Sequence, residues 1–440
     1  MKTFTISTLG CKVNQYESSQ IHQLLTDRGL RHIEEPETAD LVVVNTCCVT
    51  HIASAKSRQI IRKAGKMNPP ATVVVAGCLP VGPPDEWKNI TGNVHFVTRK
   101  ADLPDMLHDL IAAEHSHGPV ISSNKPFCEA KIKDKTGRRQ DSPTSSWPLL
   151  KAFSGQTRAF LKIQDGCDAF CSYCIIPKIR TEVCNKDVKS VLREARALVA
   201  AGHKEIVLTG IFLGAYGQDT ARRRHWDPGR RDALADLLDQ VAGVPGLHRV
   251  RMSSLEPADV TDRLLDVFCS HDNIAPHLHL PLQSGSDPIL KRMCRQYRLD
   301  DFRRSVEKLT TRLDRPAITT DIIVGFPGET DDDFAATLQL MHKVAFAKSH
   351  VFTFSPRRGT AAARMAPPVG PKVAKERSRI LQETDARLQQ QFRDRFRGET
   401  ASVIVEALDP PRGRCERYFV VELQDPAPVQ PGQVVTTIII

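Results

Sequence analysis

The sequence lacks a segment that is long and apolar enough to cross a membrane, and it lacks an obvious export signal. No apolar run approaches the ~18 residues that a spanning helix needs, and the first ten residues, MKTFTISTLG, have no continuous apolar stretch of the secretory kind. Internal repeats of solenoid length are also missing. We therefore expect a cytoplasmic protein that neither spans a membrane nor forms a repeat array.

The composition is that of an ordinary folded protein with an excess of positive charge. Hydrophobic residues make up 41% and charged residues 25% of the 440 residues, a length that favours two or three domains. The formal net charge of +10 permits a polyanionic partner such as nucleic acid without requiring one. Basic residues gather at 56–66, 221–231 and 393–399, although solvated helix faces and loops often have this composition.

Short apolar strands alternate with helical stretches in the first hundred residues. The strand candidates are 3–8, 41–45 and 72–77, with a basic helix predicted from about 52 to 67. This order predicts a parallel α/β domain. The polar segment that follows, with its Pro and Gly residues, is typical of a linker.

The alternation resumes beyond the linker and then changes to short strands alone. Six strands separated by helices predict a partial parallel (β/α)6 barrel, with candidates at 159–164, 205–210, 249–254, 277–282, 317–325 and 348–355. A long charged helix is expected over 372–396, and short strands with Pro and Gly turns then predict a small β-barrel. The predicted fold class is therefore α/β with a small β tail.

Three cysteines directly follow the first barrel strand. A reducing compartment disfavours disulfides, so clustered cysteines favour metal binding or catalysis. Cys167, Cys171 and Cys174 have the spacing C-x3-C-x2-C, which can hold three irons of a 4Fe-4S cube and leave the fourth open. A zinc site is the alternative, but a second C-x2-C pair is missing and Cys184 would supply a single extra ligand.

A second set of cysteines occupies three separate strand ends. Cys11, Cys47 and Cys78 each follow one of the first three predicted strands, and ligands gather beyond the carboxyl ends of parallel strands. This placement predicts a second cluster with an open site. Cys48 adjoins Cys47 but is expected to point the other way, since neighbouring residues leaving a strand alternate in direction.

Motifs along almost the whole chain resemble the methylthiotransferase family of radical S-adenosylmethionine (SAM) enzymes. The motifs are TLGCKVNQYES (8–18), NTCCVT (45–50), VVVAGC (73–78), DGCDAFCSYCIIP (165–177), RMSSLEP (251–257), HLHLPLQSGSD (277–287) and TTDIIVGFPGET (319–330). The resemblance implies two 4Fe-4S clusters and S-adenosylmethionine as cofactors. It places the clusters on Cys11, Cys47 and Cys78 and on Cys167, Cys171 and Cys174, which are also the catalytic residues.

The resemblance also implies the domain boundaries. Residues 1–115 are expected to form the methylthiotransferase domain with the second cluster and 116–152 a linker. Residues 153–371 are expected to form the radical SAM core, and 372–440 a connecting helix with a TRAM-like domain that binds RNA. The β tail of about 40 residues is shorter than a typical TRAM domain.

The implied reaction modifies tRNA. GCKVNQYES followed by NTC-x-VT is most similar to the branch that methylthiolates carbon 2 of N6-threonylcarbamoyladenosine at position 37. The other branches act on isopentenyladenosine in tRNA or on an aspartate of a ribosomal protein, and a noncatalytic RNA-binding protein is the alternative of a different class. The sequence identifies neither the sulfur donor nor the electron donor.

Several residues are candidates for binding S-adenosylmethionine. Tyr173 adjoins the cluster loop, Thr209 and Gly210 end the second barrel strand, and the other candidates follow barrel strand ends, the usual active-site face: Ser254, Glu256, His279 and Gln283. Local packing or hydrogen bonding is the plainer interpretation of each. The chain departs from the family pattern at Lys178–Thr181, where an Arg-Gly pair is usual, and at Phe212, where histidine is commoner.

Overall fold

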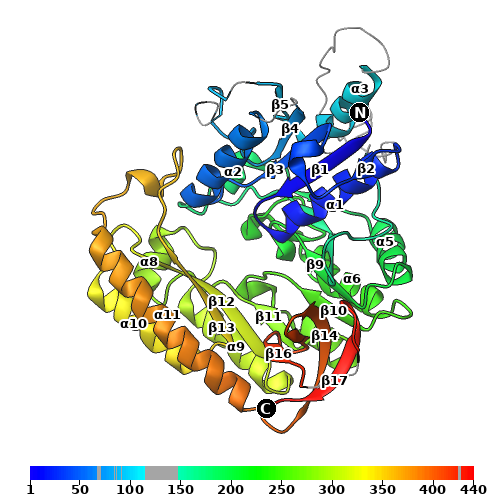
Figure 1. Cartoon of the computed structure of the whole chain (residues 1–440). Helices are drawn as coiled ribbons and strands as arrows, with labels where there is room; N and C mark the ends of the chain where they lie inside the picture. The colour runs from blue at the N-terminus through cyan, green and yellow to red at the C-terminus, as the bar shows by residue number, and fades with distance from the viewer. Residues whose placement is uncertain (67–70, 84, 86, 91, 114–146, 425–427) are drawn as a thin grey trace. The chain divides into compact units, whose positions relative to one another are not determined.

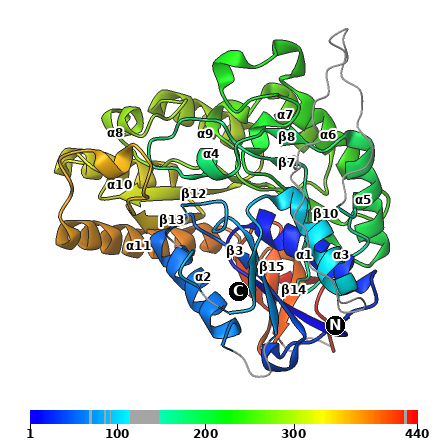
Figure 2. The same ribbon diagram turned by 90° about the horizontal axis from the view of Figure 1, so that it is seen from above.

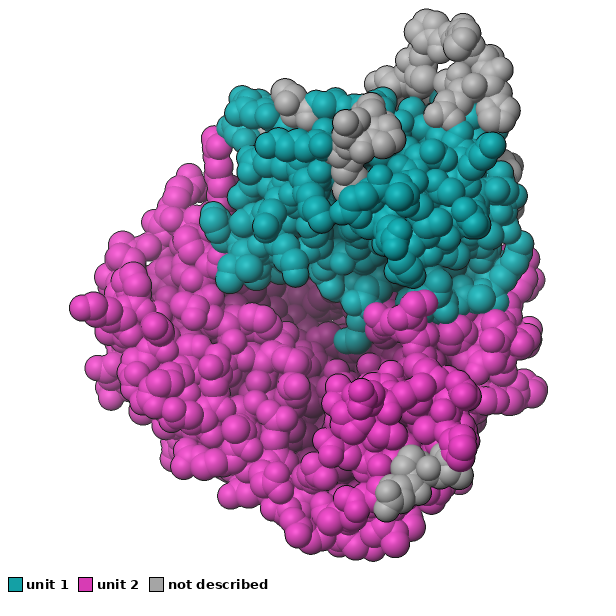
Figure 3. All heavy atoms as spheres, in the orientation of Figure 1, with its two compact units in different colours: residues 1–154 teal, residues 155–440 magenta. Residues whose placement is uncertain are grey.

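The computed structural model describes residues 1–440 except 67–70, 84, 86, 91, 114–146 and 425–427. The described chain divides into two compact units, Met1–Ser154 and Gly155–Ile440 (Figure 3). Most of the predicted linker lies outside the described residues. In the described part of the chain, no helix has both the length and the apolar character needed to cross a bilayer.

The first unit is built on a parallel sheet with the strand order β2-β1-β3-β4-β5 (Figure 1). Its strands are β1 (Thr3–Thr8), β2 (Arg31–His32), β3 (Leu41–Thr46), β4 (Thr72–Gly77) and β5 (Val94–Phe96). Its α-helices are α1 (Lys12–Thr26), α2 (His51–Ala64) and α3 (Leu103–Ala113). The three predicted strands and the basic helix are confirmed, whereas the short edge strands β2 and β5 were not predicted.

Helices cover both faces of this sheet, which explains its continuous apolar strands. Val43 and Val74 pack with side chains of α1 and α3, and Val42 and Val75 pack with Ile61 of α2. A parallel strand that is buried on both faces has no need for polar alternation. The runs LVVVN and TVVVAG are therefore core strands.

The last described part of the predicted linker binds α1. The side-chain amides of Gln20 and Gln23 donate to the carbonyls of Pro148 (2.8 Å) and Leu149 (2.9 Å). The backbone N–H of Lys151 donates to Gln23 Oε1 (2.7 Å). These residues belong to the first compact unit.

The second unit contains six parallel strands in two three-stranded sheets, ordered β10-β9-β6 and β11-β12-β13. The strands are β6 (Ala159–Lys162), β9 (Glu205–Thr209), β10 (Arg249–Met252), β11 (His277–His279), β12 (Ala317–Val324) and β13 (Lys348–Thr353). Parallel bridges from Val250 to Ile274 and from Ser254 to His279 join the two sheets into one arc. All six predicted barrel strands are confirmed.

Helices alternate with these strands and lie outside them (Figure 2). They are α5 (Val188–Ala200), α6 (Ala233–Ala242), α7 (Asp262–Ser270), α8 (Asp287–Arg292), α9 (Leu299–Arg312) and α10 (Asp331–Val344). A short hairpin of β7 (Gln164–Asp165) and β8 (Cys184–Asn185) and the short helix α4 (Ile176–Ile179) flank the cysteine loop. Short 3-10 helices span Pro36–Thr38, Lys100–Asp102, Leu213–Ala215, Arg223–His225, Pro228–Arg230, Pro257–Asp259 and Ala362–Arg364.

The carboxy-terminal region forms an antiparallel sheet that follows the long helix α11 (Pro371–Asp394). Its strands are β14 (Thr400–Leu408), β15 (Pro411–Cys415), β16 (Val420–Glu422) and β17 (Val434–Ile438), in the order β16-β15-β14-β17. Its apolar face packs on Phe392 and Phe396 at the end of α11 and on Ala317 at the start of β12. The predicted helix and β tail are confirmed.

A buried carboxylate ties this sheet to the barrel strands. Glu205 is fully buried and accepts from the guanidiniums of Arg249 (3.2 Å) and Arg251 (3.1 Å). Arg251 also donates to the carbonyls of Cys415 (3.2 Å) and Glu416 (3.1 Å) in the carboxy-terminal sheet. Burial alone would raise the pKa of Glu205, but Arg251, Arg158 and Arg249 outweigh it, and the pKa lies below its ordinary value.

Replacing Glu205 by Gln is expected to lower the free energy of unfolding by about 3–5 kcal/mol, because buried guanidiniums lose their counter-charge. Chemical denaturation at neutral pH measures the change. Because the pKa of Glu205 is lowered in the folded state, its ionised carboxylate stabilises the fold at neutral pH, and this stabilisation is lost as the pH falls through the folded-state pKa. The difference in free energy of unfolding between wild type and E205Q should therefore become smaller in acid. The matched control is Glu383→Gln, which removes an exposed partner of Arg379 and should cost about 0.5 kcal/mol or less.

Candidate functional site

The sheet of the first unit brings its three strand-end cysteines to one edge. Thr8 pairs with Asn45, and Thr46 pairs with Gly77, so β1, β3 and β4 end at nearly the same level. The N–H of Cys78 donates to the carbonyl of Thr46 (3.0 Å). Cys11, Cys47 and Cys78 therefore follow neighbouring strands in register.

The side chain of Cys47 lies against the residue that precedes Cys11. Gly10 has φ +101°, and a Cβ placed there would lie 2.9 Å from Cys47 Sγ. Only the absent side chain allows this approach. Ser57 Oγ in α2 holds the Cys47 backbone, accepting from its N–H (3.2 Å) and donating to its carbonyl (3.0 Å). Cys48 is also buried, but the contact with Gly10 belongs to Cys47.

Asn14 clamps the ends of two strands beside these cysteines. It is fully buried, and its Nδ2 donates to the carbonyls of Leu9 (2.7 Å) and Thr46 (2.8 Å). Its Oδ1 lies 3.9 Å from the sulfur of Cys11. Asn14 belongs to the motif TLGCKVNQYES, but no role for it was predicted from the sequence.

The cysteines of the second unit lie on one buried loop between β7 and α4. The N–H of Cys167 donates to the carbonyl of Arg180 (2.9 Å), and Ser172 Oγ donates to the carbonyl of Arg292 (2.8 Å). Burial raises the pKa of Cys167 and of Cys174 to about 12 and also raises that of Cys171, and the neighbouring sulfurs add to the effect at Cys167 and Cys174. The three thiols therefore share one desolvated site.

Arg295, which the sequence analysis missed, joins two predicted site residues to this loop. Its Nη1 lies 3.4 Å from the sulfur of Cys171 and 3.3 Å from the hydroxyl of Tyr173. Its Nη2 donates to Glu256 Oε1 (2.6 Å). Burial alone would lower the pKa of Arg295, but Glu256 and the other nearby groups raise it well above its ordinary value, so the guanidinium is charged.

A second arginine completes the charge pairing around Glu256. Arg223 donates to Glu256 Oε2 (3.1 Å) and to Asp259 Oδ1 (2.7 Å). Glu256 therefore accepts from two guanidiniums and links the segment around Arg223 to Arg295. The basic cluster 221–231 contains this anchor, although its sequence is equally typical of a solvated loop.

The remaining candidate residues lie along the strand ends, as predicted. Thr209 is buried at the end of β9, and the space beside Gly210 is occupied by Gln164, whose Oε1 would lie 2.9 Å from an added Cβ. Gly210 thus gives room to a side chain of the protein itself.

Ser254 and His279 form the bridge between the two sheets of the barrel. His279 contacts Thr319 Oγ1 through Nδ1 (3.0 Å) and Asp321 Oδ2 through Nε2 (3.3 Å). Gln283 adopts φ +63°, and its N–H donates to the carbonyl of Asp321 (2.8 Å). Of the predicted contacts to S-adenosylmethionine, Tyr173 belongs to the cysteine loop, and Glu256 is joined to that loop through Arg295.

The spacing of the cysteines along the loop favours a cluster over a zinc ion. Within the described ranges, no group of three Cys, His, Asp or Glu side chains stands ready to hold a metal ion, and this finding applies to zinc and to a cluster alike. A structural zinc site usually takes its four ligands from two separated pairs, and the loop offers only one C-x2-C pair, Cys171 and Cys174. The C-x3-C-x2-C spacing fits the three thiolates of a 4Fe-4S cube.

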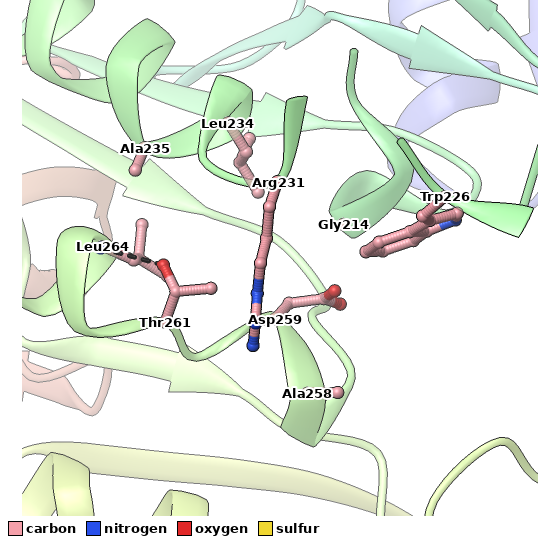
Figure 4. A pocket seen from close by; sticks show the side chains of 9 residues that line it. All are labelled: Gly214, Trp226, Arg231, Leu234, Ala235, Ala258, Asp259, Thr261 and Leu264. Atoms are coloured by element: carbon pink, nitrogen blue, oxygen red, sulfur yellow. Dashed lines mark hydrogen bonds between the residues drawn. The ribbon is translucent and has the colours of Figure 1, made fainter. Parts of the chain in front are cut away.

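A small pocket adjoins the Arg223 end of the ion-pair network through Asp259, and none of the predicted site residues lines it. Arg231 extends across it from the segment after β9, and Asp259 and Trp226 border it (Figure 4). At the departures from the family pattern, Arg180 donates to Asp165 Oδ1 (2.7 Å), and the ring of Phe212 lies 6.4 Å from that of Trp226 and 5.4 Å from the guanidinium of Arg223.

Comparisons with known proteins agree with this arrangement. Residues 3–98 match the profile described as uncharacterized protein family UPF0004, and residues 161–341 match that of the radical SAM superfamily. The chain is 38% identical to the threonylcarbamoyladenosine tRNA methylthiotransferase MtaB of Bacillus subtilis, covering 92% of this chain and 85% of the relative. The chain belongs to the radical SAM tRNA methylthiotransferase family. The family prediction is thereby confirmed, and with it a 4Fe-4S cluster and S-adenosylmethionine as cofactors of the radical SAM domain.

Other relatives belong to a second branch of this methylthiotransferase family. The tRNA-2-methylthio-N(6)-dimethylallyladenosine synthase of Acetivibrio thermocellus is 31% identical over 92% of this chain and 81% of the relative. Among solved structures, the radical S-adenosylmethionine methyltransferase TsrM of Kitasatospora setae has a TM-score of 0.55 at 14% identity, covering 81% of this chain and 77% of that one. At that identity the likeness supports the fold alone.

Replacing Asn14 by Ala is expected to lower the free energy of unfolding of the methylthiotransferase by about 1–3 kcal/mol, because two buried carbonyls lose their donor. Chemical denaturation measures the loss. Asn93→Ala, at an exposed position of the same unit, is the control and should stay within about 0.5 kcal/mol of wild type. Equal stabilities of the two variants would contradict the clamp.

Proposed function

We propose that this enzyme methylthiolates carbon 2 of N6-threonylcarbamoyladenosine at position 37 of tRNA and uses two 4Fe-4S clusters to do so. The observation that carries the proposal is the register of β1, β3 and β4, which places Cys11, Cys47 and Cys78 after three neighbouring strand ends, in addition to the triad on one loop of the second unit. A single radical SAM cluster needs only one triad. The second triad therefore supports a second cluster, and with it the insertion of sulfur.

The chemistry explains the need for a radical enzyme. Carbon 2 of adenine bears an unactivated C–H bond that ordinary acid–base groups cannot deprotonate. A 4Fe-4S cluster held by Cys167, Cys171 and Cys174 would supply an electron to bound S-adenosylmethionine, which is the one-electron chemistry that breaking such a bond requires. The residues of the chain provide the setting: Cys167, Cys171 and Cys174 would hold the cluster, and of these Cys167 is buried while Cys171 and Cys174 are half-buried.

Arg295 and Glu256 act as positioning residues in this proposal. Arg295 fixes the sulfur of Cys171 and the hydroxyl of Tyr173 on one side and Glu256 on the other. Its Nε is buried and has no acceptor among the described residues, which leaves one donor for a bound group. Cys11, Cys47 and Cys78 would hold the cluster that carries the sulfur.

The proposal also assigns roles to the parts of the chain. Residues 1–115 form the methylthiotransferase domain, 116–152 the linker, 153–371 the radical SAM core, and 372–440 the connecting helix and the TRAM-like RNA-binding domain. Arg249 and Arg251 of β10 are buried where they contact the carboxy-terminal sheet. Their burial supports folding of the TRAM-like sheet together with the core.

A dimethylallyl-type adenosine is the second candidate substrate, because relatives named for that reaction match the chain at 31% identity. Three relatives named for threonylcarbamoyladenosine match at 37–38% and a fourth at 32%, whereas further relatives named for dimethylallyladenosine match at 32–33%. Both lie in the same family, so the choice depends on the tRNA product.

Anaerobically reconstituted enzyme should contain about eight irons per chain, four for each triad. Cys47→Ala should lower the content to about four, whereas the matched variant Cys48→Ala should retain about eight. Iron analysis with Mössbauer spectroscopy measures both. Only four irons in the wild type, or equal losses in the two variants, would contradict the assignment of the second cluster.

Deleting the gene should remove 2-methylthio-N6-threonylcarbamoyladenosine from tRNA and leave the unmethylthiolated nucleoside in its place. Mass spectrometry of digested tRNA measures both nucleosides, and complementation with the Cys171→Ala variant should fail, because two thiolates cannot replace three. Loss of the methylthiolated isopentenyl nucleoside alone would assign the enzyme to the second branch instead.

A further inference from the structure

An arginine-rich segment after β9, residues 218–231, is fastened to the cysteine loop. The carboxylate of Asp168, one residue after Cys167, accepts from Thr220 Oγ1 (2.7 Å) and from the N–H of Ala221 (2.6 Å). The Nε of Arg222 donates to the carbonyl of Asp168 (2.9 Å). The segment is thus positioned by the loop that carries the radical SAM cysteines.

The base of this segment is rigid. Arg223 is neutralised by Glu256 and Asp259, and its guanidinium stands 4.5 Å from the ring centre of Trp226 and 5.4 Å from that of Phe212. The indole N–H of Trp226 donates to the carbonyl of Thr220 (2.8 Å). Trp226 and Asp259 both line the pocket shown in Figure 4. The segment therefore has a fixed conformation.

The outer side of the segment and the cysteine loop present an aromatic ring beside positive charge. Phe170, between Cys167 and Cys171, is 48% exposed. The guanidinium of Arg222 lies 5.9 Å from its ring centre, and the Nε of Arg222 also lies 3.5 Å from Asp168 Oδ2. Arg224 is exposed, and no carboxylate of the described residues lies within ion-pair distance of it. With five arginines and two aspartates, residues 218–231 carry a net charge of +3.

This combination suits unpaired nucleotides. Single-stranded RNA is bound by exposed aromatic rings that stack on bases and by arginines that contact phosphates or stack in turn. Among the cation–ring and ring–ring contacts of the described residues, Phe170 takes part in one, with Arg222, and about half of its surface is exposed. The chemistry favours RNA over an acidic protein surface, which would leave the ring of Phe170 without a stacking partner.

We propose that Phe170, Arg222 and Arg224 form a binding surface for the unpaired nucleotides that flank the target adenosine in the anticodon loop. Phe170 stacks on a base next to the target, and the two arginines contact the adjoining phosphates. The inference rests on the proposed function, because the target base must reach the radical SAM cysteines and its neighbours must then lie by Phe170. This surface would hold the anticodon loop of the tRNA, in addition to any binding of tRNA by the carboxy-terminal sheet.

The test uses the full-length enzyme and an anticodon stem-loop RNA carrying N6-threonylcarbamoyladenosine at position 37. In separate RNAs, 2-aminopurine replaces the base at position 36 or 38, and its fluorescence is quenched when it stacks. We expect the wild type to quench at least one of the two probes. Phe170→Ala and Phe170→Leu should abolish that quenching and weaken binding at least about fivefold, whereas Phe170→Tyr should retain both.

The charge contribution is tested by salt titration of the same binding. Arg224→Gln should lower the slope of log Kd against log salt by about 0.7, the value of one phosphate contact to a single strand. Arg379→Gln, an exposed arginine on α11 that pairs with Glu376 and Glu383, is the matched control and should leave the slope unchanged. The iron content and absorption spectrum of each variant verify that the cysteine loop is intact.

Each outcome bears on the proposal. Unchanged quenching and affinity in Phe170→Leu, or equal slopes for the two arginine variants, would overturn it and leave the proposed reaction untouched. Failure of the wild type to bind this RNA together with binding of the isopentenyl counterpart would refute the substrate branch, and the same variants then test the surface on that RNA. Absence of binding to either RNA would overturn the surface as well.

Discussion

The ion-paired chain from Asp259 through Arg223 and Glu256 to Arg295 is the constraint on which the radical SAM site depends. These groups are largely buried, so each charge requires its partner, and removing one would leave another uncompensated. The chain ends at the sulfur of Cys171 and the hydroxyl of Tyr173. A loop of three cysteines has little regular structure of its own, and this network fixes it against elements that arrive from 50 to 120 residues further along the chain.

In the first unit, neutral side chains and backbone hydrogen bonds fix the positions of the three cysteines. Its cysteines come from three strands, and parallel pairing places the strand ends side by side. Asn14 then joins the ends of β1 and β3, and Gly10 admits the side chain of Cys47. One unit therefore builds its triad from a local loop held by charges, and the other builds its triad from sheet register held by backbone hydrogen bonds. The difference follows from the sequence separation of the cysteines in each set.

The fold was largely predictable from the sequence, because strands alternate regularly with helices and the core strands β3 and β4 of the first unit are continuous apolar runs. The errors concern short elements: β2, with two residues, and β5, with three, leave almost no periodic signal. The packing of the described end of the predicted linker was also not predicted. The carbonyls of Pro148 and Leu149 accept hydrogen bonds from α1, and no local sequence pattern indicates these contacts. Gly210 illustrates a further limit: a glycine at a strand end suggested an approaching ligand, but the neighbouring space belongs to Gln164.

The sequence by itself identified the six candidate cluster cysteines, the order of strands and helices along the chain, and the family. These depend on residue identity and on spacing along the chain. Tertiary structure alone decided which distant side chains meet the cysteines. Arg295 and Arg223 stand in ordinary basic stretches, and only folding shows that both converge on Glu256. The reason is physical: a buried charge is stabilised by a partner in space, and the distance along the chain to that partner leaves no periodic or compositional trace.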